Sequence, residues 1–195
     1  MTQQEITRKT KETDIYLKFT PDGKGIAEID TGCGFLDHML TLFCTHSRFS
    51  LKLTCRGDMQ VDAHHTTEDI GIVLGTAFLH SLGDKRGIAR YADIILPMDE
   101  ALVLCAVDIS GRAHLSYSAN LRAKRIGNFD TELAEEFFEA FVRASKITLH
   151  IKQLDGKNTH HIIEGMFKAF ARVLKAASEQ DLTVSGEIPS SKGVI

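Results

Sequence analysis

The sequence lacks three features that would each assign it to a particular class of protein. Its four cysteines (Cys33, Cys44, Cys55 and Cys105) include no C-x-x-C pair, which argues against a zinc ribbon or a redox motif. The formal net charge is only -3, and the scattered Lys and Arg give no continuous basic face for nucleic acid. No apolar run approaches bilayer-crossing length, and residues 1–24 show no signal or transit peptide. We therefore expect a cytoplasmic protein with reduced cysteines and with neither a nucleic-acid nor a membrane partner.

The sequence does contain one short pattern twice. With 195 residues and 43% apolar content, the chain can bury a core of its own as one domain or as two small similar halves. The pattern His-His-x-x-Glu recurs at a spacing of 96 residues, as His64, His65, Glu68 and again as His160, His161, Glu164. A motif that occurs at one spacing in both halves belongs to a duplicated unit.

The surroundings of the motif repeat as well. Alternating apolar residues predict strands in SLKLTCRG from Ser50 and KITLHIKQ from Lys146, which we align at the same offset of 96. Helical periodicity follows each motif, and two further striped helices, FLDHMLTLFCT from Phe35 and LAEEFFEAFVR from Leu133, align at an offset of 98. A two-residue difference before the strand would absorb the change. A hairpin is predicted ahead of each of these helices, in residues 14–29 and 101–118.

Each half is thus predicted as a β-β-α-β-α unit. Hairpins followed by helices that need one covered face imply an α+β fold, a two-layer sandwich whose two halves pack their helices together. We place the halves at about residues 1–95 and 96–181, within a single domain. Residues 182–195 break all periodicity and are predicted to form a loop or mobile arm.

The paired histidines and their glutamates predict metal binding. Successive helical residues are about 100° apart, so two adjacent histidines cannot easily face one ion. The glutamate lies one turn on and can join either histidine. Histidine and carboxylate ligands suit Mn²⁺, Fe²⁺, Zn²⁺ or Ni²⁺. We therefore expect a two-metal site that needs ligands from another subunit, and hence a homo-oligomer.

Other residues are suited to a small anionic substrate. Charge-assisted bonds to a phosphate could come from Arg90, Arg112, Lys168, Ser190, Ser191 and Lys192. His38 stands on an otherwise apolar helix, where a lone histidine is more often a buried structural residue than a ligand.

Six ordered motifs together resemble one family across essentially the whole chain. They are GFLDHML, DAHHTTEDIGI, PMDEA, DISGRAHLSY, LHIKQLDGKNTHHIIEGMFKAFARVL and the terminal PSSKGV. They are similar to imidazoleglycerol-phosphate dehydratase of histidine biosynthesis. The resemblance implies a duplicated sandwich of the ribosomal protein S5 domain 2-like type. It also implies a cage of about 24 subunits, with two Mn²⁺ ions per active site at subunit contacts.

The resemblance also assigns residues to roles. Its metal ligands fall on His38, His64, His65, Glu68, His160, His161 and Glu164, and an eighth falls on Glu136, where many relatives have histidine. Those histidines and Glu68 also meet the substrate, as do Glu12, His46, Arg90, Asp99, Arg112, Lys168, Ser190, Ser191 and Lys192.

The implied chemistry is loss of water from D-erythro-imidazole glycerol phosphate, giving imidazole acetol phosphate. Two ions on the ring nitrogens would stabilise an imidazolate that expels hydroxide. We expect Glu164 to act as the base and Glu12 as the acid-side partner, with Glu68 and Asp99 as competitors. A metal-dependent hydrolase of small phosphate esters and a non-enzymatic metal-binding cage remain alternative functions.

Overall fold

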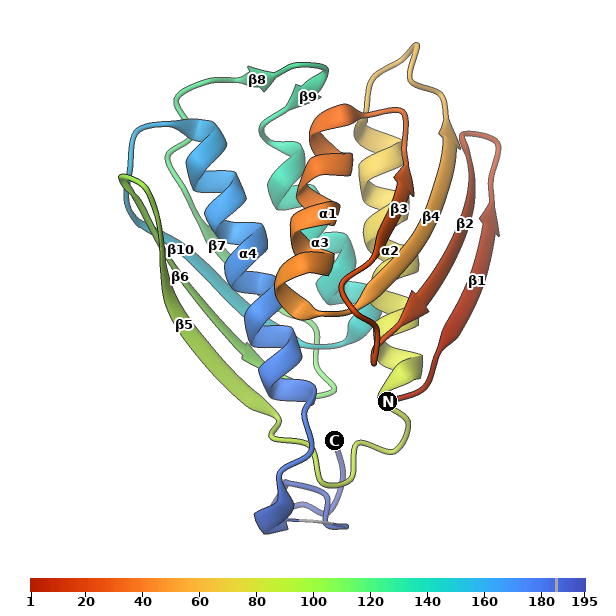
Figure 1. Ribbon diagram of the computed structural model, residues 1–195, viewed down its shortest axis with the longest axis vertical. Coiled ribbons are helices and arrows are strands. Elements are labelled where there is room, and N and C mark those ends of the chain that lie inside the picture. Colours follow the sequence, from red (N-terminus) through yellow and green to blue (C-terminus); the bar gives the residue numbers. More distant parts are fainter. Residues whose placement is uncertain (185) are drawn as a thin grey trace.

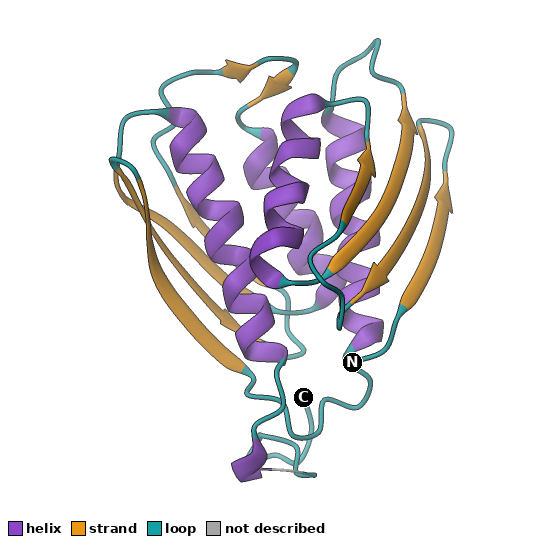
Figure 2. Cartoon of the chain, in the orientation of Figure 1, coloured by secondary structure: helices purple, strands orange, loops and turns teal. Residues whose placement is uncertain are grey.

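Four α-helices lie between two four-stranded β-sheets within residues 1–184 and 186–195, which the computed structural model describes (Figure 1 and Figure 2). Each sheet and the two helices that cover it come from one half of the chain. The predicted α+β sandwich, with the helices of the two halves packed together, is confirmed. None of the described helices is long and apolar enough to cross a bilayer.

The first half forms the sheet with strand order β1-β2-β4-β3, and β4 is antiparallel to β2 but parallel to β3. One face of this sheet is buried against the helices, so that Leu53 in β4 has no exposed surface while its neighbour Thr54 is exposed. The elements are β1 (Gln4–Lys9), β2 (Thr13–Thr20), β3 (Ala27–Asp30), α1 (Gly34–Ser47), β4 (Ser50–Gly57) and α2 (His64–Ser81).

The second half repeats this arrangement with the strand order β5-β6-β10-β7. Its main elements are β5 (Tyr91–Met98), β6 (Ala101–Asp108), β7 (His114–Ser118), α3 (Leu133–Ser145), β10 (Thr148–Asp155) and α4 (Thr159–Ser178). A small two-stranded ribbon of β8 (Arg125–Ile126) and β9 (Phe129–Asp130) precedes α3, and a 3-10 helix, η1 (Leu182–Val184), opens the C-terminal tail. The predicted boundary near residue 95 falls inside β5.

The predicted strand order within each half was wrong in two respects. Each half starts with a strand that was not predicted, β1 or β5, so the unit is β-β-β-α-β-α. The predicted hairpins do not form, because β4 lies between β2 and β3 and β10 lies between β6 and β7. Both missed strands are edge strands whose faces are at most half-buried. β1 has no apolar alternation, because Ile6 is its one apolar residue. In β5 the alternating Ala92, Ile94, Leu96 and Met98 are obscured by apolar Ile95 on the other face and by Pro97.

The alignment of the two halves also needs a correction at the strand after α1 and α3. Each helix ends in a serine followed by a left-handed residue, Arg48 (φ 63°) or Lys146 (φ 55°), so these ends match at an offset of 98. The next residue in each half, Phe49 or Ile147, is fully buried, so the strands that follow also match at an offset of 98. The two-residue difference lies after the strand, in the loops that lead to α2 and α4.

The helices of the two halves form the centre of the molecule, where α2 packs against α3 and α1 against α4. Gly71 and Gly75 lie one turn apart on α2. A Cβ atom at Gly75 would lie 2.5 Å from the carbonyl oxygen of Phe141, and one at Gly71 would lie 2.8 Å from that of Phe137. The backbones of α2 and α3 therefore approach each other closely, and this contact sets how the N-terminal ends of the two helices meet.

Candidate active site

Three side chains meet where α1 packs against the N-terminal part of α4. His160 and Glu164 are four residues apart on α4 and so share one face of the helix. Their Nε2 and Oε2 atoms lie 3.2 Å apart, and Nε2 of His38 on α1 lies 3.4 Å from the same oxygen. One ligand atom from each of the three residues lies within 4.8 Å of the others, which is a spacing that a single metal ion could bridge. His38 is thus a member of this group and is not a buried structural histidine.

The same arrangement occurs between α2 and α3. His64 and Glu68 on α2 take the places of His160 and Glu164, and Glu136 on α3 takes the place of His38, again with ligand atoms within 4.8 Å. All three side chains are half-buried. The substitution of a carboxylate for an imidazole therefore keeps three candidate ligands together, with one nitrogen and two oxygen donors where the first group has two nitrogens and one oxygen.

The second histidine of each motif points away from its neighbour. The imidazole planes of His64 and His65 meet at 83°, and those of His160 and His161 at 82°, as expected for adjacent helical residues. Nδ1 of His65 lies 3.0 Å from Oδ2 of Asp58, and Nδ1 of His161 lies 2.7 Å from Oε2 of Glu100. The structure does not bring His65 or His161 into either three-residue group.

Two candidate catalytic carboxylates lie near the outer nitrogens of these histidines. Oε1 of Glu12, in the β1–β2 turn, is 3.8 Å from Nε2 of His65, and Oδ2 of Asp99, in the β5–β6 turn, is 3.8 Å from Nε2 of His161. The turn that carries Glu12 is fixed to α2, because Thr13 donates a hydrogen bond to the buried Asp69 at 2.5 Å.

The charges around these side chains shift their pKa values. The hydrogen bond that His65 donates to Asp58 raises the pKa of His65, and the one that His161 donates to Glu100 raises the pKa of His161. Hydrogen bonds from His161 and from the backbone N–H groups of Asn158 and Lys157 lower the pKa of Glu100 to about 2.

Glu164 is almost buried, and Lys168 holds it as a carboxylate. Nζ of Lys168 lies 2.6 Å from Oε1 of Glu164 and 3.2 Å from the sulfur of Met98. Burial alone would raise the pKa of Glu164, but the hydrogen bond and charge of Lys168, together with His38, bring the pKa below its ordinary value. His46, near Lys168, has a lowered pKa because of burial and the positive charges of Lys168 and Arg172.

The remaining predicted anion-binding residues lie at the opposite end of the molecule. Nε of Arg90 donates to Asp108 at 2.8 Å, and its Nη1 donates to the carbonyl of Pro189 at 2.5 Å. Arg112 approaches the same Asp108 at 4.0 Å, and Ser190 follows Pro189 in the tail, ahead of the exposed Ser191 and Lys192.

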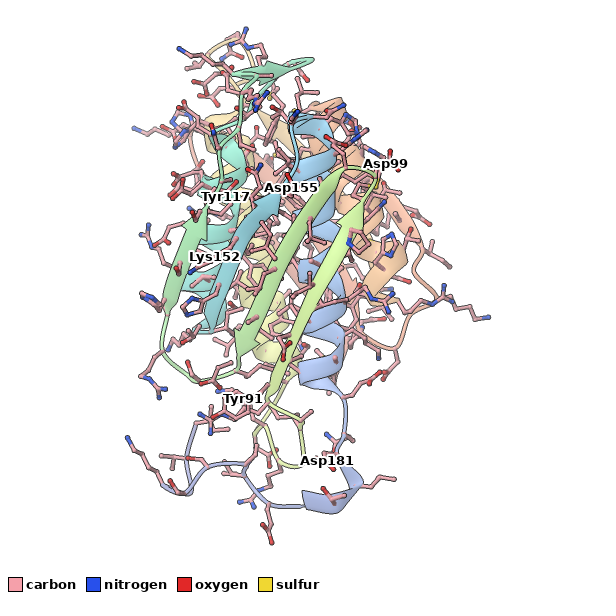
Figure 3. All side chains as sticks on the ribbon, turned by 90° about the vertical axis from the view of Figure 1, so that its left-hand side faces the viewer. Tyr91, Asp99, Tyr117, Lys152, Asp155 and Asp181 are labelled. Carbon is pink, nitrogen blue, oxygen red and sulfur yellow. The ribbon has the colours of Figure 1, made fainter. Side chains whose placement is uncertain are left out.

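Strand β5 runs from the end of the molecule with Arg90 to the end with the candidate metal ligands. Tyr91, next to Arg90, and Asp99, next to Glu100, lie at its two ends (Figure 3). A strand of this length spans roughly 25 Å. One chain therefore brings the candidate metal ligands together, but it does not bring Arg90 or Arg112 to them.

Three residues of this arrangement were missed in the sequence. Asp58 and Asp108 end a strand or follow one, and Glu100 is in a hairpin turn, where acidic residues are common for reasons of turn chemistry alone. The motif PMDEA contains Glu100, but its local pattern gives no signal that separates Glu100 from Asp99.

Comparisons with known proteins agree over nearly the whole chain. The family model described as imidazoleglycerol-phosphate dehydratase matches residues 31–174. A relative of that name from Prochlorococcus marinus is 56% identical over 193 residues, which cover 99% of this chain and 96% of the relative. One from Caldanaerobacter subterraneus subsp. tengcongensis is 54% identical over the full length of both proteins.

Solved structures give the same result. The crystal structure of imidazoleglycerol-phosphate dehydratase from Staphylococcus aureus has a TM-score of 0.82 at 43% identity and covers 92% of this chain and 100% of its own. The structure of the enzyme from Pyrococcus furiosus has a TM-score of 0.83 at 36% identity, covering 97% of this chain and 100% of its own. The resemblance in the six motifs is therefore confirmed, and the chain belongs to the imidazoleglycerol-phosphate dehydratase family.

Proposed function

We propose that the chain is a hydro-lyase that converts D-erythro-imidazole glycerol phosphate into imidazole acetol phosphate in histidine biosynthesis. Its membership of the dehydratase family supports this assignment. The structural observation that carries it is the pair of equivalent three-residue groups, each of which gathers histidine and carboxylate donors on the first turns of two packed helices.

The donor sets of the two groups suit two Mn²⁺ ions. His38, His160 and Glu164 would hold one ion, and His64, Glu68 and Glu136 would hold the other, with nitrogen and oxygen donors that this metal accepts. Three protein ligands leave positions open for substrate and for further ligands, and we assign His65 and His161 to such positions. Ions bound there would supply Lewis-acid charge to the substrate's imidazole, which would ease loss of the hydroxyl group from the neighbouring carbon.

Proton transfer requires carboxylates beside the carbon chain of the substrate. We assign Glu164 as the base, because Lys168 keeps it ionised and therefore able to accept the proton from carbon. We assign Glu12 as the acid-side partner of the leaving hydroxyl, because its carboxylate is about half exposed and lies 3.8 Å from His65. Glu164 would take the proton from carbon and Glu12 would donate one to the leaving hydroxyl, which departs as water; the resulting enol then becomes the ketone. Glu68 and Asp99 are the competitors for these roles.

The separation of the two ends of the chain supports an active site shared between copies. Arg90, Arg112, Ser190, Ser191 and Lys192 are the proposed phosphate contacts. In one chain Arg90 lies just before β5, whereas Asp99, which is 3.8 Å from His161, lies just after this strand, and a strand of this length spans roughly 25 Å. We infer that a second copy of the chain brings its Arg90, Arg112 and tail to the metal ligands of the first copy. Lys168 and His46 of the first copy would then also contact the substrate. The closed cage of about 24 subunits and the cytoplasmic location stay predictions.

The test is turnover of imidazole glycerol phosphate by protein stripped with a chelator and then titrated with Mn²⁺. We expect activity to vanish and to return near two ions per subunit. A metal-loaded protein that leaves this substrate unchanged would overturn the proposed function. Phosphate release from simple phosphate esters would then indicate the hydrolase, whereas metal uptake without binding of any phosphorylated compound would indicate the metal-binding cage.

A further inference from the structure

His65 and His161 each direct one ring nitrogen at a carboxylate. A neutral imidazole has one N–H donor and one acceptor nitrogen, and an ionised carboxylate only accepts hydrogen bonds. The contacts of Nδ1 with Asp58 at 3.0 Å and with Glu100 at 2.7 Å therefore place the proton of each ring on Nδ1. The lone pair of Nε2 is then free and points away from the carboxylate.

The carboxylate of Asp58 makes its side-chain contact with His65. Its oxygens lie 3.0 and 3.2 Å from Nδ1 of His65, and its side chain is 18% exposed. The backbone N–H of Asp58 donates to the carbonyl oxygen of Glu12 at 3.0 Å, which ties the loop after β4 to the β1–β2 turn. The backbone of Asp58 is thereby held where its carboxylate reaches His65.

Glu100 is fixed by the start of α4. Its Oε1 accepts hydrogen bonds from the backbone N–H of Asn158 at 2.7 Å and of Lys157 at 3.2 Å, while Oε2 contacts His161. One carboxylate therefore links the β5–β6 turn, the N-terminus of α4 and the imidazole ring.

The two halves make the same contact with residues that are not repeat equivalents. Glu100 precedes β6 as Glu12 precedes β2, yet Glu12 is near Nε2 of His65 and not near Nδ1. A bulge in β10 makes Gly156 the equivalent of Gly57, since the first packs against Ala101 and the second against Thr13, which begin β6 and β2. The position that matches Asp58 in the second half is therefore Lys157, which has no carboxylate. Simple inheritance from a common ancestral unit would have kept one residue in both halves, so the contact itself has a role.

We propose that Asp58 and Glu100 are positioning residues, which hold the Nδ1–H of His65 and His161 so that each Nε2 faces a metal ion. This inference rests on the proposed function, in which the two histidines are metal ligands. Carboxylate partners of this kind orient the ring and keep the correct nitrogen free, and their loss lowers metal affinity about 10–100-fold. Because Asp58 contacts Nδ1 of His65, Glu12 is not needed to orient this ring, and its half-exposed carboxylate is available to the substrate.

The experiment measures Mn²⁺ affinity by calorimetry on chelator-stripped protein carrying Asp58→Ala, Asp58→Asn or Glu100→Gln. Glu100→Gln keeps an oxygen for the N-terminus of α4 but turns an NH₂ donor towards His161, which moves the ring proton to Nε2. We expect Asp58→Ala and Glu100→Gln to weaken Mn²⁺ binding about 10–100-fold. Asp58→Asn should lose less, because its amide oxygen still accepts from Nδ1–H.

Two controls remove a nearby carboxylate that contacts only backbone. Asp62 accepts from the N–H of His64 at 2.7 Å, and Asp155 accepts from that of Gly156 at 2.7 Å. Asp62→Asn and Asp155→Asn keep these acceptors and should bind Mn²⁺ as the wild-type protein does. Wild-type affinity in both Asp58→Ala and Glu100→Gln would overturn the positioning role.

Histidine variants separate failure of this inference from failure of the proposed function. If His65→Ala and His161→Ala bind Mn²⁺ normally, the ligand assignment itself is wrong. If they lose affinity while Asp58→Ala and Glu100→Gln do not, only the positioning role is wrong. The visible spectrum of the Co²⁺-loaded protein gives a second readout, because Glu100→Gln should shift it towards that of His161→Ala and not leave it at the wild-type spectrum.

Discussion

The contacts of Glu164 support its assignment as the base. It is nearly buried, it contacts two histidines, and Lys168 holds it ionised. We expect Glu164→Gln to lower kcat by at least about 100-fold at saturating Mn²⁺, because a neutral amide cannot accept the substrate proton. Steady-state kinetics on the metal-loaded variant measures this.

A control for that variant is Glu179→Gln. Glu179 is exposed beyond the end of α4 and pairs with Lys175 at 3.6 Å, far along the helix from Glu164. Its kcat should match that of the wild-type protein. A Glu164→Gln variant that keeps full metal content and normal turnover would remove Glu164 as the base.

His46 predicts how stability changes with pH. Burial and the charges of Lys168 and Arg172 lower its pKa from 6.5, while Glu164 acts in the opposite direction. Below about pH 6.5 the unfolded chain therefore binds a proton that folded His46 does not, so the free energy of unfolding falls as pH decreases towards the folded pKa.

The His46→Gln variant isolates this contribution. Denaturant unfolding of the chelated protein at fixed subunit concentration should show a smaller loss of stability between pH 7 and pH 5 than in the wild-type protein. An equal loss in both proteins would show that His46 titrates normally.

The clustering of some candidate ligands could be predicted from sequence, because helical spacing determines which side chains share a face. His160 and Glu164 meet for that reason, and the repeat places His64 and Glu68 likewise. The contacts of Asp58 and Glu100 were not accessible, because each depends on where a loop meets a helix of different sequence position. The number of residues between Asp58 or Glu100 and its histidine follows no helix or strand periodicity, so the sequence does not show that they meet.

At the level of whole elements, the contact between α2 and α3 depends on glycine. A methyl group at Gly75 would lie 2.5 Å from a backbone oxygen of α3, which cannot move aside as a flexible side chain could. We expect Gly75→Ala to destabilise the protein by about 1–3 kcal/mol, despite the better helix propensity of alanine. Chemical denaturation at constant subunit concentration measures the change.

Gly34 provides the matched control, because it is also a helical glycine but has no atom within 4 Å of where its Cβ would lie. Gly34→Ala should leave stability unchanged or raise it by about 0.5–1 kcal/mol. Equal effects of the two substitutions would mean that backbone packing does not limit Gly75.

The element types were largely predictable, whereas the order of strands was not. The apolar residues at helical spacing in α1 and α3, and the alternating apolar residues in β4 and β10, predict these elements from local sequence alone. The insertion of β4 between β2 and β3 is a pairing of segments distant in sequence, and the turn residues in PDGKG suit a hairpin equally well. The polar β1, with only Ile6 as an apolar residue, gives no strand signal although it is fully paired with β2.

At the scale of the whole molecule, the proposed active site requires two copies of the chain. A His160→Ala variant lacks a metal ligand, and an Arg90→Ala variant lacks a phosphate contact at the opposite end. Each should be nearly inactive alone. Unfolding and reassembling an equal mixture should restore about a quarter of wild-type activity, since random pairing joins one intact metal end to one intact arginine end in that fraction of sites.

Mixtures of each variant with itself, treated in the same way, are the control. If the mixed sample stays as inactive as its components, both ends act within one chain and the shared site is wrong. The sequence indicated oligomerisation through the divergence of adjacent histidines and through the family resemblance. It gave no sign that Arg90 and Asp99 lie at opposite ends of a strand, because β5 was not predicted.

The position of β4 has a consequence for synthesis of the chain on the ribosome. β1 and β2 can pair as soon as they emerge, but β3 pairs only with β4, which is made about twenty residues later, after the whole of α1. The second half repeats this delay, because β7 waits for β10. Each sheet therefore closes when its central strand arrives, and until then β2 and β3, or β6 and β7, present open edges that can pair with another nascent chain.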